Sequence, residues 1–303
     1  MIPWMMFTVW CSSTAIMAKP ASDGGRGVPV IAAINHVAAG RYEHAVTVSN
    51  RLLQSRSTAP VGSALKGIAL ARMGRYADAM PWLGVADGLS IFENQGGRKT
   101  YADALRSVGE GGRAWEVRSV LAEPGVRPVR RLRAMCHGID DLLSVGAIEE
   151  AIRLGEDALA LAPGSATAHA YYATALLAGG ERDLAEWHHW VSARTTNIEL
   201  PQRVLNAARI ATLYGDVEAA GSAWERVWEL RPLSSSVVAG YAAWLREQGD
   251  LDGAWAILNG VRVQKLQDAF IVAERTRTLR GMDSKASQNE QDRLERLFPS
   301  RVR

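Results

Sequence analysis

The sequence predicts an all-α solenoid built from helix–turn–helix repeats, and three observations carry that prediction. A glycine followed five residues later by an alanine recurs seven times in one register, with successive glycines 34, 35, 37, 34, 35 and 34 residues apart. A small residue stands seven positions before six of these seven glycines. Nowhere do apolar and polar residues alternate for long enough to indicate a β-strand. The seven pairs are Gly40/Ala45, Gly74/Ala79, Gly109/Ala114, Gly146/Ala151, Gly180/Ala185, Gly215/Ala220 and Gly249/Ala254.

Each repeat glycine is expected at the point where a first helix ends and the chain turns sharply into a second helix. Glycine adopts the left-handed conformation there without steric cost. The small residue before it and the alanine after it then face each other, so the two helices can approach closely. Asp216 and Asp250 directly follow their glycines and are expected to cap the second helix. Pro163 and Pro232 are expected to end it.

This register resembles that of the tetratricopeptide repeat, which has a small residue at its eighth position, glycine at the fifteenth, alanine at the twentieth and proline at the thirty-second. Residues 201–234 carry Ala208, Gly215, Ala220 and Pro232 at these places. Residues 60–93, 166–199 and 235–268 match nearly as well, and residues 95–131 match least. The resemblance covers residues 26–268 and implies a right-handed α-solenoid of about seven repeats that binds a protein or peptide in its concave groove.

We expect four segments along the chain. Residues 1–18 contain no charge and have the length of a secretory signal peptide. Residues 19–26 form a linker and residues 27–268 form the solenoid. Residues 269–303 hold a capping helix, a polar linker and a short terminal helix, with Ser287 and Glu290 as its capping box. The signal peptide predicts a periplasmic or secreted protein; an uncleaved anchor, a misread start and a cytoplasmic location stay open as alternatives.

Composition suits an ordered, soluble chain, with 48% apolar and 22% charged residues. The net charge of +3 is mildly basic, and a nucleic-acid partner is not expected. Two cysteines, Cys11 and Cys136, say little about the redox compartment. The basic run at residues 127–133 is interpreted as a solvated loop and helix start, with an anionic partner as the alternative.

No residue cluster predicts catalysis, a cofactor or a metal site. His188 and His189 would project about 100° apart on a helix and cannot chelate one ion together. We expect the tryptophans around them, Trp187 and Trp190, to pack between helices and the two histidines to lie at the solvent edge. Cys136 and its neighbour His137 also point apart, so the imidazole cannot activate that thiol. The sequence therefore predicts a protein that is not an enzyme.

The concave groove implied by the resemblance is the candidate binding site. Its apolar end would hold Val30, Ile31, Ile34, Val37, Leu65 and Ile68. Asp103 follows Lys99 by four residues and would repel the carboxylate of a chaperone tail. Asn206 and Arg209 share one helix face, as do Tyr171 and Thr174, and all four are expected to be exposed. The candidate groove residues are Lys99, Asp103, Arg106, His137, Asp140, Tyr171, Thr174, Asn206 and Arg209.

These features predict a scaffold or adaptor that holds a protein or peptide in the groove. A secretory signal would place it in a bacterial-type envelope, where envelope assembly or polysaccharide export are the roles expected by analogy of fold. The alternative is a solenoid that binds a carbohydrate or another small ligand through Tyr171 and the polar centre of the groove.

Overall fold

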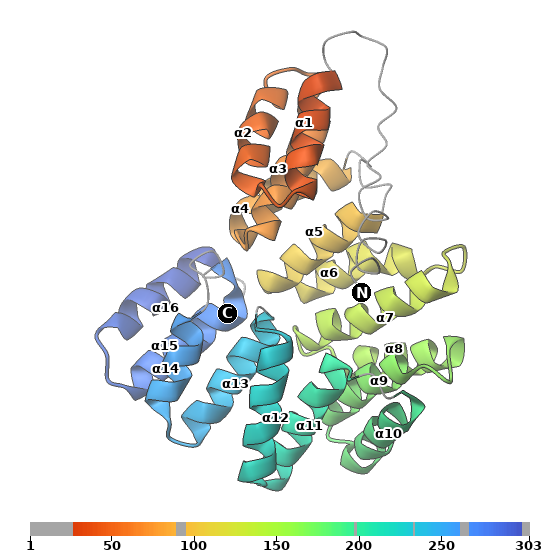
Figure 1. Ribbon diagram of the computed structural model, residues 1–303, viewed down its shortest axis with the longest axis vertical. Helices are drawn as coiled ribbons and strands as arrows, with labels where there is room; N and C mark the ends of the chain where they lie inside the picture. Colours follow the sequence, from red (N-terminus) through yellow and green to blue (C-terminus); the bar gives the residue numbers. More distant parts are fainter. Residues whose placement is uncertain (1–26, 89–94, 197–198, 233, 261–266, 299–303) are drawn as a thin grey trace, which may run out of the picture. The chain divides into compact units, whose positions relative to one another are not determined.

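The computed structural model describes residues 27–88, 95–196, 199–232, 234–260 and 267–298 (Figure 1). These residues form sixteen α-helices, and no strand occurs among them, as predicted. None of the helices in these ranges is long and apolar enough to cross a lipid bilayer. The expected signal segment and linker, residues 1–26, lie outside the described residues. Contacts between residues divide the chain into two compact units, Met1–Leu105 and Arg106–Arg303.

The first unit contains two helix pairs and most of a fifth helix. Its helices are α1 (Gly27–Ala38), α2 (Tyr42–Leu52), α3 (Ala59–Arg72), α4 (Tyr76–Gly88) and α5 (Gln95–Ser107). Helix α1 packs against α2, and α3 packs against both α2 and α4. Gly67 shows why a small residue precedes the turn, because a Cβ there would lie 2.7 Å from Cγ of Leu83. Close helix approach therefore depends on this position, as the register predicts.

The second unit contains the remaining helices. They are α6 (Gly111–Ser119), η3 (Val120–Ala122), α7 (Pro128–Leu143), α8 (Ile148–Leu161), α9 (Ala166–Gly179), α10 (Arg182–Thr195), α11 (Pro201–Tyr214), α12 (Val217–Leu230), α13 (Ser235–Glu247), α14 (Leu251–Asn259), α15 (Ala269–Gly281) and α16 (Ala286–Leu297). The first helices α7, α9 and α11 lie side by side, and each packs against its own second helix, α8, α10 and α12 (Figure 1). We call the surface formed by α7, α9 and α11 the first-helix face.

The turns confirm the predicted register. All seven repeat glycines have a positive φ, between 70° and 91°, and no other glycine of the described ranges does. At Gly40, Gly146, Gly180, Gly215 and Gly249 an added Cβ would meet nothing within 4 Å, so the requirement is conformational and not one of space. The alanines that follow five residues later are all 0% exposed.

The helix ends also follow the prediction. Asp216 Oδ1 accepts a hydrogen bond from the Ala219 amide at 3.0 Å, and Asp250 Oδ1 accepts one from the Gly253 amide at 2.8 Å. Helices α8 and α12 both end two residues before a proline, Pro163 and Pro232 respectively.

The C-terminal segment differs in one detail from the expected cap. Helices α15 and α16 pack against each other as a further helix pair. The expected capping box is wrong: α16 begins at Ala286, its N-cap Lys285 makes no side-chain cap hydrogen bond, and Glu290 instead pairs with Arg275 at 3.0 Å. Arg275 is only 9% exposed, and a buried guanidinium needs an anionic partner more than a helix end needs a cap.

Candidate functional site

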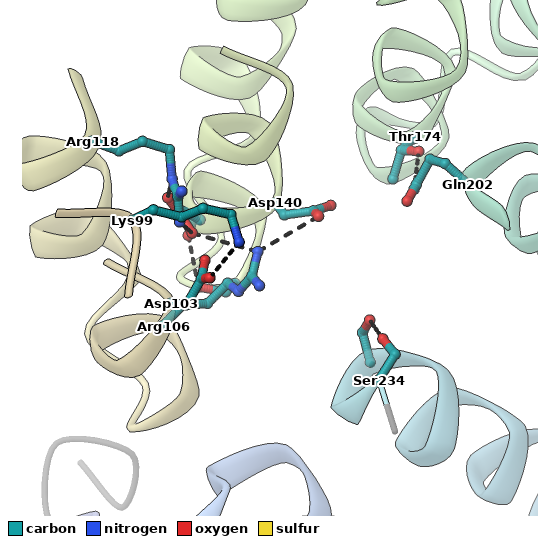
Figure 2. Close-up of polar contacts among 11 residues, drawn as sticks. Lys99, Asp103, Arg106, Arg118, Asp140, Thr174, Gln202 and Ser234 are labelled. Atoms are coloured by element: carbon teal, nitrogen blue, oxygen red, sulfur yellow. Dashed lines mark hydrogen bonds and ion pairs between the residues drawn. The ribbon is translucent and has the colours of Figure 1, made fainter. Parts of the chain in front are cut away.

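A network of arginines and aspartates lies at the N-terminal end of the second unit. Arg118 and Asp141, 1% and 0% exposed, form an ion pair in which Arg118 Nε donates to Asp141 Oδ2 at 2.6 Å. Arg106 Nη1 lies 3.6 Å from Asp140 Oδ2 and 3.5 Å from Asp141 Oδ1. Figure 2 shows the side chains of Arg106 and Asp140 pointing toward one another. Arg106 thus lies within ion-pair distance of both aspartates, whereas Arg118 pairs closely with Asp141.

Positive charge exceeds negative charge around Asp140. Burial raises the pKa of the Asp140 carboxyl, and Arg106, Arg209, Arg231 and Arg118 oppose that rise. Burial lowers the pKa of Arg209, and Asp140 opposes that decrease. Among the described residues no ion pair joins Arg209 or Arg231 to a carboxylate. Four guanidinium groups thus share two aspartates, and the surplus favours an anionic ligand.

The sequence reasoning missed Arg231. It follows the last residue of α12, whereas the groove positions implied by the resemblance lie on first helices only. The sequence did offer one signal for Arg231, because it directly precedes Pro232 and so could be placed at the end of the second helix.

Arg209 lines a cavity of about 400 Å³ on the first-helix face. Thr174 and Trp224 also line it, together with the apolar side chains Leu143, Leu177 and Leu213. Trp224 is held in place because its Nε1 donates to Thr212 Oγ1 at 3.2 Å. The cavity therefore places one charged donor beside an apolar wall, which suits a ligand that carries both a carboxylate and an apolar group.

Asn206 and Thr174 correct the prediction that they are exposed. They are 0% and 2% exposed, and they join α9 to α11. Thr174 Oγ1 lies 2.8 Å from Asn206 Oδ1 and also accepts from Gln202 Nε2 at 2.8 Å, a contact visible in Figure 2. Asn206 Nδ2 donates to the Ala170 carbonyl oxygen at 2.7 Å. These side chains form a buried polar clamp between neighbouring first helices, and Asn206, which is 0% exposed, has no surface for a ligand.

Tyr171 is likewise buried, at 4% exposed, although it was expected to line the groove. Burial, and then Asp140, raises the pKa of its phenol. The His137 ring meets it edge-on at a centroid distance of 6.0 Å. A ring packed in this way cannot stack on a sugar, so the alternative of a carbohydrate groove loses the residue on which it depended.

The remaining candidate residues belong to the first unit. Lys99 Nζ lies 3.1 Å from Asp103 Oδ2, so these two charges balance each other. The expected apolar end of the groove is mostly core: Leu65 and Ile68 are 0% and 8% exposed. Val30, Ile34 and Val37 pack against that core, and Ile31 is the exposed exception.

The cluster at residues 186–190 was expected to bury its tryptophans and expose its histidines, and the structure shows otherwise. Trp187 and Trp190 are each 52% exposed, whereas His188 is 6% exposed. His188 Nδ1 lies 2.8 Å from Nδ1 of His169, a residue that the sequence reasoning did not single out. His169 Nε2 lies 3.0 Å from the Pro163 carbonyl oxygen, so Nε2 carries the proton and Nδ1 accepts from His188. His188 is therefore the donor in this pair, through the proton on its Nδ1.

Cys136 and Arg131 have structural roles. Burial raises the pKa of the Cys136 thiol to about 12, so it stays protonated and unreactive. Arg131 Nε donates to the Ala122 carbonyl oxygen at 3.0 Å and ties the start of α7 to the turn before it. Within the described ranges no group of three His, Cys, Asp or Glu side chains is placed to hold a metal ion.

No protein-family profile and no curated protein match this chain. Several solved structures do, among them a tetratricopeptide repeat protein from Parabacteroides merdae, with a TM-score of 0.47, 13% identity, and coverage of 82% of this chain and 93% of the other. Pseudomonas aeruginosa pilF has a TM-score of 0.46 and 17% identity, with coverage of 69% and 93%. The human IFIT1 dimer with m7Gppp-AAAA has a TM-score of 0.49 and 14% identity, with coverage of 89% and 72%. The chain is an all-α array of tetratricopeptide-like helix pairs, and these likenesses concern that fold alone.

Proposed function

We propose that this chain is a protein-binding scaffold whose second unit holds an acidic segment of a partner on the first-helix face. The observation that carries the proposal is Arg209, which lines the cavity between α9 and α11 and has no ion pair among the described residues. Arg231 and Arg106 add positive charge around Asp140. The leucines of the cavity supply apolar contact, so an acidic segment with interspersed apolar residues fits best.

The test uses the full chain and two labelled peptides, one of Glu and Leu residues and one with Gln replacing each Glu. Fluorescence anisotropy should show binding of the acidic peptide only. Arg209→Ala should weaken that binding about tenfold, because a charge-assisted hydrogen bond is lost. Arg153→Ala is the matched control, since Arg153 is exposed on α8, away from the cavity, and pairs with Glu150. Equal affinity for the two peptides, or unchanged affinity after Arg209→Ala, would remove the proposal.

The cellular setting is a separate part of the proposal. A role in envelope assembly or polysaccharide export rests on the uncharged composition of residues 1–18. Mass spectrometry and fractionation of the native protein test it, because an intact Met1 on a soluble cytosolic protein would argue against an envelope setting.

A further inference from the structure

A second cavity lies on the other side of α11, between α10 and the start of α12. It measures about 430 Å³, and its lining includes Glu186, His189, Trp190, Tyr214 and Asp216. Trp190 and Tyr214 are 52% and 57% exposed. Two exposed aromatic rings that line one hollow indicate a contact surface.

Two buried polar atoms at this cavity have no hydrogen-bond partner among the described residues. They are Oε1 of Glu186 and Nδ1 of His189. The other interaction of the Glu186 carboxylate is with the Tyr214 hydroxyl, which donates to it. An unpaired buried carboxylate oxygen is costly, so a donor from outside would gain more here than at an exposed surface.

The chemistry of the lining selects the charge of the ligand. The lining residues include two carboxylates, Glu186 and Asp216, and neither lysine nor arginine. The Trp190 ring already holds the Arg194 guanidinium at 4.6 Å from its centroid, which shows that this ring accepts a cation. Aromatic faces beside carboxylates are the environment that a planar guanidinium prefers, since it can stack and donate two hydrogen bonds at once.

We propose that this cavity binds an arginine side chain presented by a partner protein. The guanidinium would donate to Glu186 Oε1 and stack against Trp190 or Tyr214, with Asp216 supplying a second negative charge. The exposed apolar side chains around the cavity would contact the rest of the partner segment. This site has the opposite charge to the cavity at Arg209, so its occupant is a different segment.

The experiment follows the indole N–H signal of Trp190 by NMR in the full chain, assigned by its loss in Trp190→Phe. The probes are Ac-Gly-Arg-Gly-NH2, the same peptide with neutral citrulline, and agmatine, a free small guanidine. The arginine peptide should shift the signal saturably and the citrulline peptide should not. Glu186→Gln should weaken binding about fivefold or more. Asp157→Asn, an exposed carboxylate on α8, should leave it unchanged.

Asp216→Asn guards against a folding effect, because asparagine caps a helix as well as aspartate while removing the charge. This variant should also weaken binding of the arginine peptide. Equal shifts from the arginine and citrulline peptides would show that the cavity does not select charge and would overturn the proposal. Unchanged affinity in both folded carboxylate variants would also overturn it. So would binding of agmatine about tenfold tighter than the peptide, which would assign the cavity to a small guanidine.

Discussion

At the scale of single residues, Asn206 shows how a polar side chain on a first helix can stabilise the stack. It is 0% exposed and bonds to Thr174 and to the Ala170 carbonyl oxygen. Asn206→Ala would remove two buried hydrogen bonds between α9 and α11, so we expect a loss of about 1–3 kcal/mol in the free energy of unfolding, measured with urea. Arg209→Ala, on the same helix but without such bonds, should change it by less than about 0.5 kcal/mol. Equal losses would contradict the clamp.

At the scale of helices, substitutions of glycine can distinguish a requirement for a positive φ from a requirement for close packing. Gly215 has φ of 71° and open space around a Cβ. Gly215→Ala should therefore destabilise the chain by about 1–2 kcal/mol through backbone strain alone. Gly112 in α6 also has open space but no positive φ, so Gly112→Ala should stabilise by about 0.5–1 kcal/mol. Thermal unfolding of both variants checks the pair, and a shift of the same sign in each would contradict the assignment.

The same elements show what the sequence could and could not predict. The turns were predictable because a positive φ selects glycine locally, whatever lies around it. The burial of Tyr171, Thr174 and Asn206 was not predictable, because it depends on how closely α9 packs against α7 and α11. The burial of His188 and the exposure of Trp187 and Trp190 could not be predicted for a similar reason. His188 forms a hydrogen bond with His169 on α9, and helical periodicity does not reveal that partner.

At the scale of the whole molecule, a net charge of +3 hides two surfaces of opposite sign. Helix α11 contributes to both, with Arg209 in one cavity and Tyr214 in the other. A scaffold with this arrangement can hold an acidic segment and an arginine at once without either competing for the same charges. Both contacts are partly exposed, so salt should weaken both.

The stability of the folded chain should also depend on pH, chiefly through His188. Burial, and then His169, lowers the pKa of His188 from 6.5 to about 4, and the side chains packed against it are His169 and Tyr172 on α9 and Trp187 beside it on α10. Between these two pH values His188 is protonated in the unfolded chain but not in the folded chain. Stability is therefore fully present above pH 6.5 and falls as the pH decreases toward 4, by at most about 3 kcal/mol from this residue.

Urea unfolding at about pH 8, 6 and 4.5 measures this dependence. His188→Gln should flatten the curve in that window, because the unfolded chain then gains one proton fewer on acidification. Burial also lowers the pKa values of His36 and His189 and raises that of Asp140, so the slope that remains is the sum of these opposing contributions. If His188→Gln kept the slope of the unchanged chain, burial would not lower the pKa of His188 in the fold and this prediction would be wrong.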